Sequence, residues 1–273
     1  MRYFDTRPLV LLLTVLLAGL PGCVKFKQVV TVFPDGSGKM HMSMAINEQM
    51  LTMAGDEDPF ADFSIHELAD QEALGWSAFS EPRVYSADGF KTVEFTGYFL
   101  DINAVSFGGD APAGDEADAP ADGEIDQAPE PSTTFQLVDG KLTVTGGMVA
   151  QMINEMGSDP SLNDPQTRAM MAPMMQGLEI SETYVLPGDV QQADGYTADG
   201  RTAALTVTSD DLLGDQPFTV AALEDGTSEI TFDPAPWDDQ KAWRAEFAAA
   251  QAAWTELKAR AVEVDEPAPV GAE

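Results

Sequence analysis

Reactive and metal-binding side chains are scarce in this sequence, which has one cysteine and two histidines among 273 residues. A single cysteine cannot form an internal disulfide. His41 and His66 do not have the spacing of a metal-binding pair, and the Gly-x-Ser-x-Gly motif of serine hydrolases is missing. We therefore expect no catalytic residue, no metal and no cofactor, and a protein that is not an enzyme.

Basic residues are also few, since 14 lysines and arginines stand against 46 aspartates and glutamates, for a formal net charge of −32. A field of this sign repels nucleic acid and anionic lipid head groups. We therefore expect no nucleic-acid partner. Hydrophobic residues make up 44% of the chain, which is enough for the core of one domain.

The sequence lacks a hydrophobic run long enough to span a bilayer. An uncharged apolar stretch at residues 8–20 follows Arg2 and Arg7. A basic head before a short apolar run is typical of a secretory signal peptide, so we expect residues 1–22 to be removed. Their removal takes away two arginines and one aspartate, which leaves 251 residues with a formal charge of −33.

The apolar stretch ends in the four residues Leu20, Pro21, Gly22 and Cys23. They resemble the lipobox of bacterial lipoproteins, in which cleavage precedes a cysteine whose thiol is diacylated. The resemblance implies that Cys23 is the first residue of the mature protein and carries two or three acyl chains, such as palmitate. These would anchor the protein in the membrane, because several chains keep a protein membrane-bound far longer than one does. Val24 after the cysteine implies export to the periplasm and sorting to the outer membrane. The alternatives are an ordinary cleavable signal or a buried thiol at Cys23.

Apolar and polar residues alternate after Cys23, as in a half-buried β-strand. One face is predicted to carry Val24, Phe26, Gln28, Val30 and Val32. Turn residues follow at 34–38 and alternation resumes at 39–45, which predicts a hairpin. Further strands are predicted at 76–85, 90–100, 133–138, 141–145, 178–186, 202–208, 218–223 and 228–232. Short helices are predicted at 48–54, after Asn47 as a cap, and from a capping box at 64–67 to Gly75.

Composition divides the chain into segments. Residues 108–132 are rich in alanine, proline, glycine and acids, and they cannot bury enough apolar surface to offset the cost of ordering. This predicts a disordered acidic insertion. Periodic apolar residues predict a helix over 238–263. We therefore expect an α+β domain with a mainly antiparallel sheet at 23–232, an amphipathic helix within 233–264 and a disordered tail at 265–273.

Two predicted short helices, at 147–157 and 165–176, are rich in methionine. Methionines four residues apart share one helix face. Because methionine is flexible and polarizable, such a face suits an apolar ligand, and gap-filling in a core is the alternative. The predicted lining of a ligand site comprises Met148, Met152, Met156, Met170 and Met174.

Another methionine cluster lies in the predicted strand 39–45, where His41 stands among Met40, Met42 and Met44. Thioether and imidazole ligands suit copper(I). In a strand, however, the methionines share one face and His41 points to the other. A methionine-lined sheet face is therefore favoured over a metal site.

The predicted C-terminal helix carries an apolar stripe. Its largest members are Trp243, Phe247, Trp254 and Leu257. Packing on the protein's own sheet is the favoured interpretation, because the stripe covers barely three heptads. Contact with a partner protein of the cell envelope is the alternative.

The early part of the chain has the order lipobox cysteine, strand, Asp-Gly turn and strand. A strand at 180–185, Pro187-Gly188-Asp189-Val190, Asp194-Gly195 and a strand at 205–208 follow. This arrangement, over residues 23–213, resembles the LppM-like domain of bacterial lipoproteins. The resemblance implies an α+β fold whose curved sheet, built of hairpins, and short covering helices enclose an apolar cavity. It carries over no catalytic residue.

These features predict a membrane-anchored, extracytoplasmic lipoprotein that binds an apolar or lipid-like ligand without catalysis. The alternative function is a scaffold subunit of the envelope that binds a partner protein through the tryptophan stripe.

Overall fold

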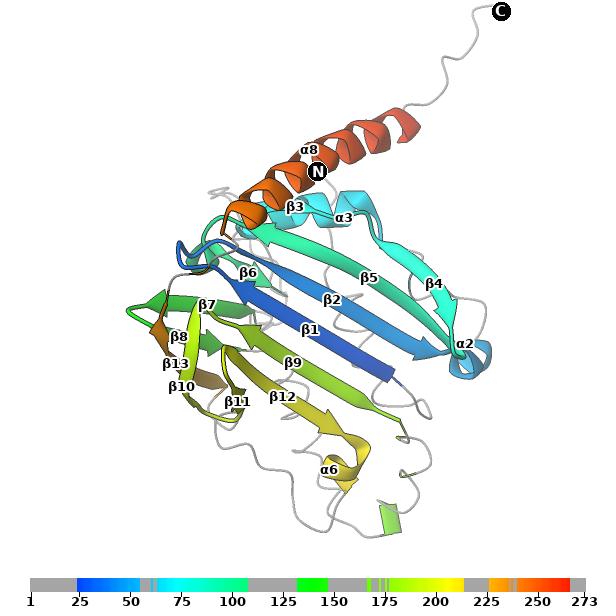
Figure 1. The fold of residues 1–273 in the computed structure, drawn as a ribbon. Helices are drawn as coiled ribbons and strands as arrows, with labels where there is room; N and C mark the ends of the chain where they lie inside the picture. Colours follow the sequence, from blue (N-terminus) through cyan, green and yellow to red (C-terminus); the bar gives the residue numbers. More distant parts are fainter. Residues whose placement is uncertain are drawn as a thin grey trace, which may run out of the picture.

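The computed structural model describes residues 24–54, 60, 63–107, 132–146, 166–167, 172, 175, 177–213, 226–235, 237 and 240–265. Two β-sheets contain most of them, and the helices lie at the edge and ends of the larger sheet (Figure 1). The predicted α+β class is confirmed. Several predicted features lie outside the described residues: the lipobox at 20–23, the segment 108–131, the strand at 218–223, and Met148, Met152, Met156, Met170 and Met174.

The larger sheet has eight strands in the order β11-β12-β9-β1-β2-β5-β3, and β4 pairs with the same edge of β5 as β3. In chain order they are β1 (Val24–Val32), β2 (Gly38–Asn47), β3 (Trp76–Phe79), β4 (Arg83–Ala87), β5 (Phe90–Phe99), β9 (Glu179–Val185), β11 (Thr197–Asp199) and β12 (Thr202–Thr208). Only β1 and β9 run parallel among these pairs of described strands. The predicted strand 76–85 is divided in two near Pro82, which has no N–H to donate to a ladder.

A second sheet of five antiparallel strands lies at one end of the larger one (Figure 1). Its order is β10 (Gly188–Ala193), β13 (Thr227–Pro234), β8 (Lys141–Thr145), β7 (Thr133–Val138) and β6 (Ser106–Phe107). The chain passes from β9 into β10 at Gly188, where a Cβ atom would come within 1.8 Å of the Asp233 carbonyl oxygen. Glycine therefore lets β10 meet β13. Neither β10 nor β11 is among the strands that the sequence predicts.

Alternate residues of the larger sheet form a buried surface that we call the inner face. None of its members is more than 8% exposed. They are Ala203, Leu205 and Val207 on β12; Ile180, Glu182 and Tyr184 on β9; Val24, Phe26, Gln28, Val30 and Val32 on β1; Met40, Met42, Met44 and Ile46 on β2; and Val93, Phe95 and Phe99 on β5. The face predicted for β1 is therefore confirmed, and period-two alternation places it in the core.

Two short helices begin where the sequence supplies caps, as predicted. Helix α2 (Glu48–Ala54) follows Asn47, whose Oδ1 accepts a hydrogen bond from the Gln49 N–H at 2.8 Å. Helix α3 (Ile65–Asp70) opens on the capping box of Ser64 and Glu67, and η1 (Gln71–Leu74) ends at Gly75 with φ +91°. Two further short elements, η2 (Ile102–Ala104) and α6 (Ser209–Leu213), were not predicted.

The C-terminal helix α8 (Gln240–Asp265) begins and ends two residues later than predicted, and the tail begins after Asp265. It lies along the β3 edge of the larger sheet (Figure 1). Trp243 stacks on Phe33, with ring centroids 4.4 Å apart, and Trp254 meets Phe79 edge-on at 5.4 Å. In the described part of the chain, no helix has the length and apolar composition to cross a bilayer.

Polar contacts hold both ends of α8. Arg244 lies 3.6 Å from a carboxylate oxygen of Asp35, near the start of the helix. Towards its end, Trp254 Nε1 donates a hydrogen bond of 2.6 Å to Glu72 Oε1, which also accepts one from Lys258. Partial burial alone would raise the pKa of Glu72, but these hydrogen bonds lower it below its ordinary value. The helix is therefore held by both apolar and charged groups.

Trp254→Ala should lower the free energy of unfolding by about 3–5 kcal/mol, because it removes a buried ring and the hydrogen bond to Glu72. Urea denaturation of the full chain measures the change. Gln251→Ala is the matched control on the exposed side of the same helix, with an expected change within about 0.5 kcal/mol. Similar losses in the two variants would contradict the docking of α8.

Candidate functional site

A carboxyl group lies near the centre of the inner face. Glu182 is 1% exposed, and its two oxygens accept hydrogen bonds from two tyrosines. Tyr184 Oη lies 2.6 Å from Oε1, and Tyr196 Oη lies 2.8 Å from Oε2. Tyr184 is two residues further along β9 and shares its face, whereas Tyr196 comes from the turn between β10 and β11. The tyrosine rings meet edge-on with centroids 5.6 Å apart, which joins this turn to the larger sheet.

Burial governs the proton affinity of this cluster. It raises the pKa of Glu182, and the hydrogen bonds from Tyr184 and Tyr196 offset that rise only in part. Burial and the neighbouring carboxylate also raise the pKa of both tyrosines well above 10.0. Ser228, on β13, completes the cluster with a hydrogen bond to Tyr196. Each group is therefore biased towards its neutral form in the folded chain.

Gln28 lies beside Glu182 on the neighbouring strand, since the two are register partners of β1 and β9. Its side chain is on the inner face, and the residue is 2% exposed. Among the described residues, its carboxamide has no hydrogen-bond partner. Leaving a buried amide unpaired costs about 1–3 kcal/mol. The inner face thus combines an apolar surface with a free polar group, which is the composition of small-molecule sites.

The methionines of β2 line the same surface. Met40, Met42 and Met44 are buried on the inner face, and Met42 is the register partner of Gln28 on the side away from β9. His41 points to the opposite face, where its Nδ1 lies 3.1 Å from Thr96 Oγ1. The favoured interpretation, a methionine-lined sheet face, is confirmed. In the described part of the chain, no three histidine, cysteine or acidic residues gather where they could hold a metal ion.

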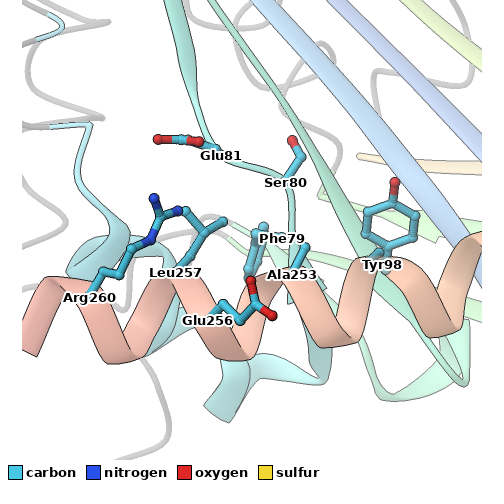
Figure 2. Close-up of a pocket in the computed structure, with 9 residues that line it drawn as sticks. Phe79, Ser80, Glu81, Tyr98, Ala253, Glu256, Leu257 and Arg260 are labelled. Carbon is cyan, nitrogen blue, oxygen red and sulfur yellow. The ribbon is translucent and has the colours of Figure 1, made fainter.

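A second candidate is an open groove of about 270 Å³ between α8 and the end of β3 (Figure 2). Phe79, Ala253 and Leu257 form its apolar part, and Glu81 and Arg260 lie at its rim. Ligand pockets commonly measure about 300–1,000 Å³ and enclose their ligand. The groove is smaller than these pockets and open to solvent, so it does not have the form of an enclosed ligand site.

The apolar stripe of α8 packs against the rest of the domain. Trp243, Trp254 and Leu257 are at most 5% exposed, and Phe247 packs against the core while partly exposed. The favoured interpretation, packing on the protein's own sheet, is thus confirmed. A partner protein could reach the buried stripe only if α8 left the domain.

Sequence reasoning did not select Gln28, Glu182 or Tyr196. The first two carried a signal, because each is a polar residue at an apolar position of a predicted strand. Tyr196 carried none, since it belongs to a turn that folds back over the sheet. Met148, Met152, Met156, Met170 and Met174, the predicted lining, lie outside the described residues.

Comparison with known proteins gave one structural match of low similarity. No protein-family model and no curated protein matches the chain. The folded domain of LppM from Mycobacterium tuberculosis, solved by NMR, matches 80% of this chain and 94% of its own length. The two share 11% sequence identity, and the TM-score is 0.36. At this level the match assigns neither residue roles nor function.

Glu182→Gln should change how stability depends on pH. The pKa of Glu182 in the folded protein lies above its ordinary value of 4.5. Its stabilising contribution is therefore complete below the unfolded pKa and is lost as pH rises through the folded pKa. Relative to the variant, the free energy of unfolding of the wild type should fall as pH increases from about 4 to 9. Urea denaturation across this range tests the expectation.

The matched control for this experiment is Glu179→Gln, an exposed position on the same strand, which should follow the wild-type pH profile. Parallel profiles for Glu182→Gln and the wild type would show that the carboxyl ionises as readily in the folded chain as in the unfolded one.

Proposed function

We propose that the chain is a lipoprotein of the bacterial cell envelope, anchored through acyl chains on Cys23, whose domain binds an apolar, lipid-like ligand on the inner face. The observation that carries the binding role is the composition of that face. It extends over five adjacent strands, is apolar in nearly every position, and contains one buried carboxamide that has no partner among the described residues. A surface that only filled a core would gain from an apolar residue at Gln28.

The methionines support a ligand with a flexible chain. Met40, Met42 and Met44 lie side by side on β2, at the middle of the inner face. Unbranched thioether side chains can adjust to varied apolar shapes, which suits acyl chains of different length or unsaturation. We propose that the further methionines of the sequence also contact this ligand: Met148, Met152, Met156, Met170 and Met174.

Binding without catalysis is consistent with the chemistry of the described residues. Glu182 is the carboxyl nearest to the proposed ligand, and both of its oxygens already accept hydrogen bonds. The strongly negative charge favours neither nucleic acid nor another polyanion. Because Val24 follows the proposed anchor at Cys23, we propose the outer membrane as the location of the protein.

Replacing Cys23 tests the anchor. When the full chain is produced in a bacterium fed labelled palmitate, the wild type should carry the label and sediment with membranes. Cys23→Ser should carry no label, because the hydroxyl group does not replace the thiol in the acylation reaction. Equal labelling of the two proteins would contradict lipidation at this residue.

Native mass spectrometry of the full chain, released from a mild detergent, tests ligand binding. We expect a population that retains one lipid-sized adduct, and lipid extraction should identify a molecule with a long hydrocarbon chain. A protein that carries no adduct and takes up no long-chain compound when incubated with one would contradict the proposed function.

A further inference from the structure

Strand β4 forms an exposed edge of the larger sheet (Figure 1). All five of its residues are exposed, and among the described strands it pairs with β5 alone. Arg83 Nη1 donates a hydrogen bond of 2.8 Å to Glu94 Oε1 on β5, and Tyr85 Oη donates one of 3.1 Å to Glu94 Oε2. The ion pair with Glu94 also offsets the charge of Arg83. An edge held in this way presents backbone groups to which an extended segment can pair without rearrangement.

An apolar row of the inner face ends at this edge. Val84 is the register partner of Val93 on β5, which pairs in turn with Met44 on β2. The exposed fraction rises from 1% at Val93 to 46% at Val84. An added strand with an apolar residue opposite Val84 would continue the row and cover the exposed side chain. The edge therefore favours a segment in which apolar residues alternate with polar ones.

The groove beside α8 adjoins the segment that leads from β3 into β4 (Figure 2). Phe79, Ser80 and Glu81 line one side of it, and Ala253 and Leu257 of α8 line the other. Its volume of about 270 Å³ is below the range of small-molecule pockets and suits a single side chain. An extended segment that pairs with β4 and continues past Glu81 would bring one of its side chains to this groove.

Charge selects the kind of segment that fits. The groove and the end of β4 carry three carboxylates against one guanidinium group: those of Glu81, Asp88 and Glu256, and that of Arg260. A second copy of the chain would bring the same formal net charge of −32, so the two copies would repel each other. A basic segment, in contrast, is attracted by these carboxylates and by the field of the whole chain.

We propose that the β4 edge and the groove beside α8 bind an extended, basic segment of a partner protein, which adds one strand to the larger sheet. The backbone of the segment pairs with β4, and its apolar side chains contact Val84 and enter the groove. Its basic side chains lie near Glu81, Asp88 and Glu256. This inference concerns the margin of the sheet and depends neither on a ligand at the inner face nor on the buried stripe of α8.

Peptides of defined sequence test the proposal. Their binding to the full chain, held in a mild non-ionic detergent, is measured by fluorescence anisotropy. The probe is a labelled peptide of sequence Phe-Lys-Val-Lys-Val-Lys-Phe, whose terminal phenylalanines can reach the groove in either strand direction. One comparison peptide has glutamate in place of every lysine. Another keeps the probe sequence and charge but has N-methylated backbone nitrogens, which cannot donate hydrogen bonds to a strand. Both should bind at least about tenfold more weakly than the probe.

Two substitutions locate the binding site. Val84→Lys places a like charge at the apolar contact, and Ala253→Trp fills the groove, so each should weaken binding of the probe about tenfold or more. Val138→Lys makes the same change of charge at a valine of β7 that is 50% exposed, and it should leave the affinity unchanged. Ala252→Trp is the control for the groove, at an exposed neighbouring position of α8. All four positions are exposed, so we expect the variants to fold.

Other outcomes overturn the proposal. If the probe does not bind, or binds no better than its N-methylated form, no strand is added. Equal or tighter binding of the glutamate peptide would show that the segment is not basic. If Val84→Lys and Ala253→Trp weaken binding no more than Val138→Lys and Ala252→Trp do, the peptide binds elsewhere. If the chain forms dimers that Val84→Lys dissociates, the occupant of the edge is a second copy.

Discussion

The parallel pairing of β1 with β9 is the constraint on which the rest of the structure depends. Parallel neighbours cannot be joined by a hairpin, so the chain between Val32 and Glu179 must leave the strand and return. Strands β2, β5, β7 and β8 all belong to that excursion. The pairing also sets register: a slip of one residue would turn Gln28 to the outer face and bring a neighbour such as Lys27 into the core.

Two buried polar side chains stand next to each other on the inner face, and they differ in one respect. Both oxygens of Glu182 accept hydrogen bonds, and one of the donors, Tyr196, joins the turn after β10 to the larger sheet, so the carboxyl group contributes to the fold. Gln28 makes no such contribution within the described residues. Satisfied buried groups help to specify a fold, whereas an unsatisfied one needs another explanation, and the ligand that we propose is one.

Local patterns predicted local structure well. The alternation that begins at Val24 correctly predicted β1 and its buried face. The capping box at Ser64 correctly predicted the start of α3. What could not be predicted depends on residues distant in sequence. No periodic pattern in the sequence predicts the parallel β1–β9 pair, the second sheet or the turn that contains Tyr196. Which strands pair with one another depends on tertiary packing between residues far apart in the chain. The same limit explains why Gln28 and Glu182 looked like isolated exceptions to apolar patterns rather than neighbours.

Strand β1 begins at Val24, the residue directly after the proposed lipid anchor. If Cys23 is acylated as we propose, the end of the larger sheet that carries α2 and α6 (Figure 1) would stand at the bilayer surface. Lys25 and Lys27, exposed on β1, would then lie near the head groups despite the acidity of the whole chain. Gln28 lies five residues beyond Cys23, which is about 17 Å along an extended chain. The tether would thus set the height to which a lipid must rise from the leaflet to reach its site.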